Sequence, residues 1–183
     1  MTTYIALLRG INVGGHNKIK MVELRDALTL SGLTNVKTYI QSGNVIFQSE
    51  QPEDSLQKQI EDKIWSDFHI RTSVVLRNAE EWQVLMEGLP FSEQKIADAA
   101  ATAQGQCLHV AMLAKELNPA VTEQFLRYTN EQECGAVKGR DIYLLFNNSI
   151  RNAKLANQLN KLEVPATVRN WKTICKIGEI VQS

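Results

Sequence analysis

The sequence predicts an α+β protein made of two tandem ferredoxin-like plaits, with extra helices. Short apolar runs typical of strands alternate with segments whose apolar residues recur at helical spacing. A glycine-containing hairpin turn falls at an equivalent place in each half of the chain. Both halves therefore read as β-α-β-β-α-β, the split ferredoxin-like order. The halves share this topology with almost no residue identity.

The first half opens with a nearly continuous apolar run, Tyr4–Leu8, which is typical of a strand in the interior of a sheet. Ser31-Gly32 ends the helix that follows, and Ser42-Gly43-Asn44 turns a hairpin. In order, we expect a strand at 4–8, a helix at 21–30 with Met21, Leu24, Ala27, Leu28 and Leu30 on one face, a hairpin at 36–49, a helix at 56–68, a strand at 73–77 and a helix at 82–89.

The second half repeats this order. Asn118-Pro119 is a helix start, with a cap followed by a first-turn proline. We expect a strand at 106–113, a helix from 119, a hairpin at 134–146 that turns at 138–141, a helix at 150–162, a strand at 165–169 and a last helix at 171–181. The alanine-rich segment 97–105 carries little core material. It predicts a linker between an N-terminal subdomain, 1–96, and a C-terminal subdomain, 106–183, although it also fits an exposed helix or loop.

Composition narrows the classes of function. The chain has 183 residues, 44% of them hydrophobic, and a formal net charge of zero, which disfavours a globally basic nucleic-acid-binding protein. It has neither a long apolar run nor a signal-peptide pattern at its N-terminus, so we expect a cytoplasmic protein without a membrane partner. Three widely spaced cysteines, Cys107, Cys134 and Cys175, indicate reduced thiols.

The loop after the first strand is the main candidate for a functional site. Strands one and two run parallel in this fold, so the loop and the first hairpin turn lie at the same end of the sheet. From Arg9 to Met21 the sequence contains no acidic residue. Cations, amides, a hydroxyl and glycine backbone N–H groups would share this edge: Arg9, Gly10, Asn12, Gly14, Gly15, His16, Asn17, Lys18, Gln41, Ser42, Gly43 and Asn44. Such an edge suits an anion or another polar ligand.

Known phosphate motifs do not match this loop. Gly10 and Gly15 have the spacing of a Walker loop, but His16 and Asn17 stand where Lys and Ser or Thr are required. Nucleotide hydrolysis is therefore disfavoured. The glycines either help to form a ligand site or only allow the chain to turn, and the sequence leaves both interpretations open.

The motifs "LLRGINVGGHNKIKM", "TYIQSGNVIF" and "TVRNWKT" resemble the bacterial family catalogued as domain of unknown function 1697. The resemblance implies a tandem ferredoxin-like fold, and no activity is established for the family. It carries over to Arg9, Gly10, Asn12, Gly14, Gly15, Lys18, Gln41, Ser42, Gly43, Asn44, Arg169, Asn170, Trp171 and Thr173. The chain departs from the family pattern in "SIRNAKL", where Ile150 replaces a glycine and Ala153 replaces a serine.

The segment "TVRNWKT" is a second candidate site. A strand leads into Arg169, Asn170 reads as an N-cap, and no acidic residue occurs between Val164 and Gly178. An arginine beside a helix N-terminus attracts anions. The alternative is a routine capped helix whose Trp171 fills the core.

We therefore expect a cytosolic binding module for a small anionic or phosphate-bearing ligand at the glycine loop and the adjacent turn, without a cofactor. The first alternative is an enzyme of unknown reaction at the same edge, with His16 as the acid or base. The second is nucleic-acid binding through local basic stretches, which the net charge does not favour. His16, His69 and His109 are scattered and show no metal-like spacing with the cysteines.

Overall fold

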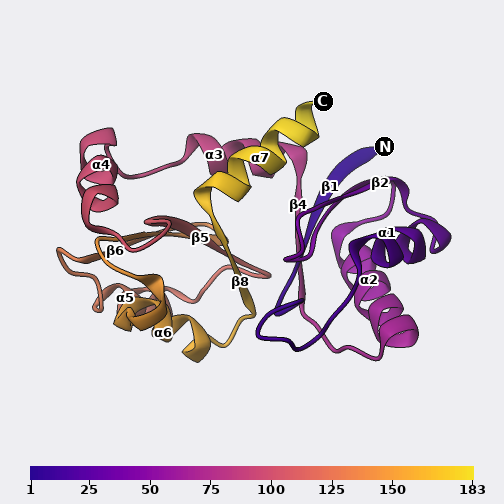
Figure 1. Cartoon of the computed structure of the whole chain (residues 1–183), viewed down its shortest axis with the longest axis horizontal. Coiled ribbons are helices and arrows are strands. Elements are labelled where there is room, and N and C mark those ends of the chain that lie inside the picture. Colours follow the sequence, from indigo (N-terminus) through magenta and orange to yellow (C-terminus); the bar gives the residue numbers. More distant parts are fainter. The chain divides into compact units, whose positions relative to one another are not determined.

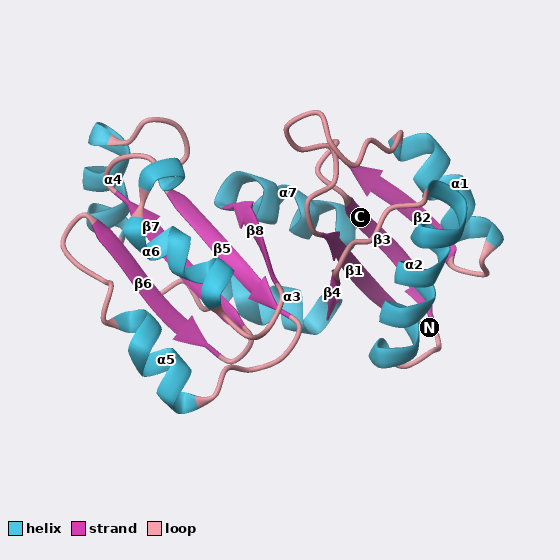
Figure 2. Ribbon diagram, turned by 90° about the horizontal axis from the view of Figure 1, so that it is seen from below, coloured by secondary structure: helices cyan, strands magenta, loops and turns pink.

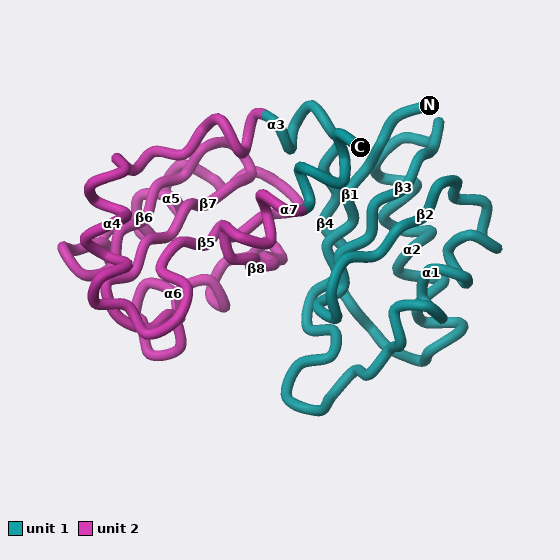
Figure 3. Tube along the Cα trace, turned by 45° about the horizontal axis from the view of Figure 1, so that its top comes forward, with its two compact units in different colours: residues 1–83, 177–183 teal, residues 84–176 magenta.

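The computed structural model describes residues 1–183 and divides into two compact units (Figures 1 and 3). Unit 1 comprises Met1–Gln83 and Ile177–Ser183, and unit 2 comprises Val84–Lys176. The chain passes from unit 1 to unit 2 within helix α3 (Ala79–Glu87) and returns within helix α7 (Trp171–Gln182). No helix has both the length and the apolar character needed to cross a membrane.

Unit 1 has the ferredoxin-like order of elements. These are β1 (Thr2–Leu8), α1 (Met21–Leu30), β2 (Thr34–Tyr39), β3 (Asn44–Ser49), α2 (Glu53–Phe68) and β4 (Val74–Asn78). The sheet has the order β2-β3-β1-β4, and every neighbouring pair of strands is antiparallel. This arrangement confirms the predicted plait in the first half.

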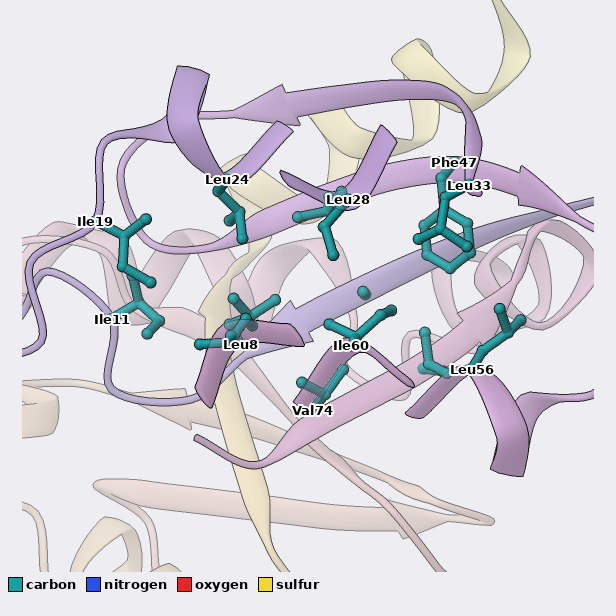
Figure 4. Packing of buried hydrophobic residues seen from close by; sticks show 14 of the residues in the cluster. Leu8, Ile11, Ile19, Leu24, Leu28, Leu33, Phe47, Leu56, Ile60 and Val74 are labelled. Atoms are coloured by element: carbon teal, nitrogen blue, oxygen red, sulfur yellow. The ribbon is translucent and has the colours of Figure 1, made fainter. Parts of the chain in front are cut away.

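The core of unit 1 lies between the sheet and the two helices α1 and α2 (Figure 4). Alternate strand residues such as Leu8 and Phe47 meet Leu24 of α1 and Ile60 of α2, as the period of two in strands and the helical spacing require. Leu30 was expected on the buried face of α1, but it is 85% exposed, because it lies about 200° around the helix from the buried Leu28.

Unit 2 repeats the plait, with more helical pieces. Its elements are α4 (Glu93–Thr102), β5 (Leu108–Leu113), α5 (Pro119–Leu126), β6 (Glu133–Lys138), β7 (Asp141–Phe146), η1 (Ile150–Asn152), α6 (Lys154–Gln158), η2 (Leu159–Lys161) and β8 (Ala166–Asn170). The antiparallel sheet order is β6-β7-β5-β8, equivalent to that of unit 1 (Figure 2). The single helix expected at 150–162 is interrupted at Ala153, which is extended (ψ 128°) between η1 and α6.

The segment 97–105, expected to be a linker, lies inside unit 2, and the contacts divide the chain after Gln83. Helix α4 occupies most of this segment because Ser92 caps its first turn, accepting a hydrogen bond from Lys95 N–H at 3.2 Å, and alanine favours helix. Ala99 is fully buried and joins Leu108 and Leu145 in a small core. Helices therefore pack on both faces of this sheet, not on one face as expected.

Candidate functional site

The Arg9–Lys20 loop and the first hairpin turn lie together at one edge of the unit 1 sheet. Leu8 N–H donates to the Gly43 carbonyl at 2.9 Å, and the Asn12 side-chain amide donates to the Gln41 carbonyl at 2.7 Å. On the other side of β1, Arg9 N–H donates to the Ser73 carbonyl at 3.0 Å. The placement predicted from the crossover rule is confirmed.

The loop folds back on itself as a small hairpin. Asn12 N–H donates to the Asn17 carbonyl at 3.1 Å, and His16 N–H donates to the Val13 carbonyl at 3.0 Å. Gly14 (φ 58°) and Gly15 (φ 78°) occupy the two positive-φ positions that a tight two-residue turn requires. The glycines thus shape the turn.

Two isoleucines anchor the ends of this hairpin. Ile11 and Ile19 are 1% and 3% exposed and belong to the core cluster of unit 1, where Figure 4 shows them at the loop end. Burying such a side chain contributes about 1.5–3 kcal/mol. The exposed segment between them is therefore held on a fixed base.

The asparagines of the proposed site hold the backbone. The Asn12 carboxamide bonds both the N–H and the carbonyl of Ile19, each at 2.9 Å. The Asn17 amide donates to the Gly10 carbonyl at 3.1 Å. Asn44 is fully buried, and its amide donates to the Tyr39 carbonyl and to Ser42 Oγ, both at 3.0 Å. These amides hold the backbone of the edge in place. Asn44 was expected among the ligand-binding residues, but its side chain is buried and bonded within the protein.

Gly43 permits a close approach of two backbones. Its φ is 81°, and a Cβ built on it would lie 2.8 Å from Leu8 Cβ. The neighbouring Ile40 also has a positive φ, 49°, which is unusual for a β-branched residue. The turn is consequently fixed in one conformation against β1.

An open hollow of about 640 Å³ lies where the loop meets the turn. Its lining consists of Asn12, Gly15, Lys18, Ile19, Lys20, Glu23 and Gln41. Lys20 Nζ lies 3.5 Å from Glu23 Oε1, in an exposed ion pair. The side chains of Lys18 and Gln41 make no hydrogen bond or ion pair within the protein. The Lys18 ammonium and the Gln41 amide in the hollow can therefore both bond a ligand.

Four of the predicted loop and turn residues line this hollow: Asn12, Gly15, Lys18 and Gln41. The others lie outside its lining: Arg9, Gly10, Gly14, His16, Asn17, Ser42, Gly43 and Asn44. Three lining residues were not predicted from the sequence: Ile19, Lys20 and Glu23. The sequence did contain a signal for the Lys20–Glu23 ion pair. Glu23 is the first carboxylate after the acid-free stretch, and it stands three residues, or one helical turn, from Lys20.

The second predicted constellation is a buried strand end in unit 2. Arg169 is 8% exposed, and its Nη1 donates to Thr167 Oγ1 and to the Val168 carbonyl, both at 2.9 Å. Burial lowers the pKa of Arg169 to about 10, so the guanidinium remains charged near neutral pH. Asn170 Oδ1 accepts from Thr173 N–H at 2.9 Å and caps α7, as expected. Trp171 is half-buried and packs with the core beside α4.

The same strand end occurs in unit 1, where it was not predicted from the sequence. Arg77 is 1% exposed at the end of β4, and Asn78 Oδ1 accepts from Glu81 N–H at 2.8 Å in the first turn of α3. Arg77 pairs with Ile5 of β1, and Arg169 pairs with Val110 of β5. The dipeptide Arg-Asn before a helix was the signal for this internal repeat.

The cysteines and His109 do not form a recognisable metal or catalytic site. Cys107, Cys134 and Cys175 are free thiols, and Cys134 Sγ donates to the Asn130 carbonyl at 3.3 Å. Burial lowers the pKa of His109 to about 4, an effect that the neighbouring Cys107 backbone offsets only in part. No group of three or more His, Cys, Asp or Glu side chains is placed to hold a metal ion.

Comparison with solved structures finds a similar chain described as "conserved bacterial protein SP0830 from Streptococcus pneumoniae". It is 28% identical, the match covers 100% of this chain and 99% of that chain, and the TM-score is 0.80. Comparison with curated proteins gives no match.

A family model described as "Protein of unknown function (DUF1697)" matches residues 1–143, which include the whole of unit 1's sheet, the glycine loop, and β5, β6 and the first half of β7 in unit 2. The match covers well over half of the sequence and agrees with the motifs of the glycine loop and its neighbouring hairpin. The chain therefore belongs to the DUF1697 family of proteins of unknown function.

Proposed function

We propose that the protein binds a small anionic or phosphate-bearing ligand in the hollow between the Arg9–Lys20 loop and the Ile40–Gly43 turn. The proposal places the protein in the cytosol, where its thiols stay reduced. Lys18 supplies the positive charge, and the Gln41 amide supplies a neutral donor. Gly15 has no heavy atom within 4 Å of the place that a Cβ would occupy, so a ligand can approach its backbone.

The observation that carries the proposal is the length of the loop, for which unit 2 provides an internal comparison. In unit 2, Leu113 N–H donates to the Arg140 carbonyl at 2.8 Å, the equivalent of the Leu8 to Gly43 bond. The loop that follows Leu113 there, Ala114–Asn118, has five residues, whereas Arg9–Lys20 has twelve. The same crossover closes with the shorter loop, so the topology does not require the additional hairpin.

The loop is also preorganised, because contacts within the protein hold its conformation without a ligand. Two buried isoleucines and three bonds from the Asn12 carboxamide hold its base. A preorganised loop loses less conformational entropy on binding, which favours affinity for a small ligand. The Lys20–Glu23 pair compensates its own charges, so Lys18 determines the sign of the charge offered to a ligand.

A thermal-shift panel of inorganic phosphate, nucleotides and sugar phosphates tests the proposal on the wild type and on Lys18→Ala. Binding stabilises by RT ln(1 + [L]/Kd), or about 2.7 kcal/mol at a hundredfold excess over Kd. Without ligand, Lys18→Ala should melt close to the wild type, because an exposed charge contributes about 0–1 kcal/mol.

Lys115→Ala is the matched control, since Lys115 is an exposed lysine of the short unit 2 loop. We expect the shift to persist in Lys115→Ala and to disappear in Lys18→Ala. If the wild type responds to no anion, or if Lys18→Ala responds as the wild type does, the proposal fails.

A further inference from the structure

Unit 2 contains a separate hollow of about 290 Å³, and most of the polar side chains that line it are not hydrogen-bonded within the protein. Four primary amides line it, and none of their side chains makes a hydrogen bond within the protein: Gln104, Gln132, Asn148 and Asn152. The asparagines of the unit 1 loop, in contrast, are all engaged with backbone groups. A primary amide offers donors and an acceptor together, so this lining suits a ligand that can both give and receive hydrogen bonds.

The backbone around the hollow is held in place by hydrogen bonds. Asn147 N–H donates to the Gln132 carbonyl at 2.9 Å, and Thr102 Oγ1 donates to the Asn147 carbonyl at 2.7 Å. Asn130 Oδ1 accepts from the N–H groups of Gln132 and Glu133 at 2.8 and 3.0 Å. The backbone at Gln132 and beside Asn148 is therefore held in place.

The Glu133 carboxylate gives the hollow a negative charge, which disfavours an anionic ligand. Its two carboxylate oxygens accept from Lys154 N–H at 3.2 Å and from Leu155 N–H at 2.7 Å, which fixes the carboxylate at the start of α6. Neither lysine nor arginine side chains line the hollow. A phosphate there would be repelled by the carboxylate, whereas a hydroxyl can donate to its remaining lone pairs.

One lining residue, Phe146, contacts a residue that has a buried polar atom without a hydrogen-bond partner. His109 is 9% exposed, its Nδ1 has no hydrogen-bond partner, and its ring meets that of Phe146 edge-on at 6.0 Å between centroids. Phe146 lines the hollow.

We propose that unit 2 binds a neutral, hydroxyl-rich small molecule, of the size of a single hexose, in the hollow formed by the four amides, Glu133 and Phe146. The volume stands at the lower end of the range of small-molecule pockets, about 300 Å³, which fits one ring and not a dinucleotide. The site is independent of the anion site of unit 1 and differs from it in charge.

The experiment is a titration of 15N-labelled full-length protein with neutral hexoses, glucose first, followed through the side-chain NH2 resonances of asparagine and glutamine. We expect shifts confined to the four lining amides and their neighbours. Asn148→Ala should weaken binding about tenfold, since one hydrogen-bonding group worth ~1.4 kcal/mol is removed. Asn157→Ala, at an exposed amide on α6, should leave the affinity unchanged.

Two further arms test the charge and the class of ligand. Glucose 6-phosphate should bind more weakly than glucose to the wild type, and Glu133→Gln should remove that difference. The absence of localised shifts with every neutral hexose overturns the inference, as does tighter binding of glucose 6-phosphate or of the nucleoside adenosine than of any hexose. Lys18→Ala should leave the hexose titration unchanged, which separates this result from the unit 1 proposal.

Discussion

The Asn12 side chain bonds Ile19 in the manner of a β-ladder, accepting from its N–H and donating to its carbonyl, each at 2.9 Å. A second donor bond reaches the Gln41 carbonyl at 2.7 Å. One carboxamide thereby joins the two ends of the loop and connects them to the hairpin turn. Asn12 itself has φ 56°, a conformation that asparagine tolerates better than most residues.

We expect Asn12→Ala to lower the free energy of unfolding by about 2–3 kcal/mol, since three hydrogen bonds of ~0.5–1.5 kcal/mol each are lost. Chemical denaturation measures the change. Asn12→Gly is the matched variant, because it loses the same bonds without the left-handed backbone strain. Asn12→Gly should therefore be the more stable of the two, and wild-type stability in both would show that other contacts hold the loop.

Alanine substitutions at Gly43 and Gly15 can distinguish the cost of steric overlap from the cost of backbone strain. Their φ values are 81° and 78°, but only at Gly43 does an added Cβ meet another atom closely, Leu8 Cβ at 2.8 Å. We expect Gly15→Ala to cost about 1 kcal/mol of stability and Gly43→Ala clearly more. Denaturant midpoints of the two variants, measured side by side, check the order. Equal losses would mean that the turn shifts to admit the methyl group.

His109 should make stability depend on pH. Burial lowers its pKa from 6.5 to about 4, so between these values the unfolded chain binds more protons than the folded protein. Stability then rises with pH across this window and is lost as the pH falls, by about 3 kcal/mol in all. From pH 7 to pH 4 the unfolding free energy of the wild type should fall relative to that of His109→Leu, because leucine takes up no proton.

The control for that titration is His16→Gln, because His16 is exposed on the loop. This variant should follow the wild-type curve. A constant difference between wild type and His109→Leu at every pH would contradict the prediction, since it would mean that His109 takes up a proton without unfolding.

The three thiols should react at different rates. Cys107 and Cys134 are 9% and 8% exposed, while Cys175 is half-buried. We expect a disulfide reagent to modify Cys175 first in the native protein, and to find three thiols after unfolding without a reductant. Cys175→Ser should remove the fast phase. Recovery of a single thiol would indicate a disulfide.

The order of elements could be predicted because it depends on patterns that each strand and helix carries in its own residues. The alternation in the first hairpin and the spacing of Leu56, Ile60 and Ile64 on α2 are local signals, and all three of these side chains are fully buried. The crossover rule then placed the loop beside the turn without any knowledge of side-chain contacts.

The functions of individual polar residues could not be predicted in the same way. Asn12 and Gln41 look alike in the sequence, yet the Asn12 amide is engaged with backbone groups while the Gln41 side chain is uncommitted. Which amide bonds the backbone depends on φ values and on distances between segments far apart in the chain. The alanine-rich segment was misleading for a related reason, since the buried Ala99 and the partly buried Ile96 pack α4 against the sheet.

Unit 1 is assembled from two separate stretches of sequence, Met1–Gln83 and Ile177–Ser183, whereas unit 2 is contiguous. On the ribosome, the first 83 residues emerge early, but the remaining piece of unit 1 is made only after the whole of unit 2. Because domains fold as units during synthesis, the inserted unit 2 can complete its fold on the nascent chain while unit 1 still awaits its final seven residues. The order of completion then reverses the order of translation, and the Arg9–Lys20 loop belongs to the unit that is completed last.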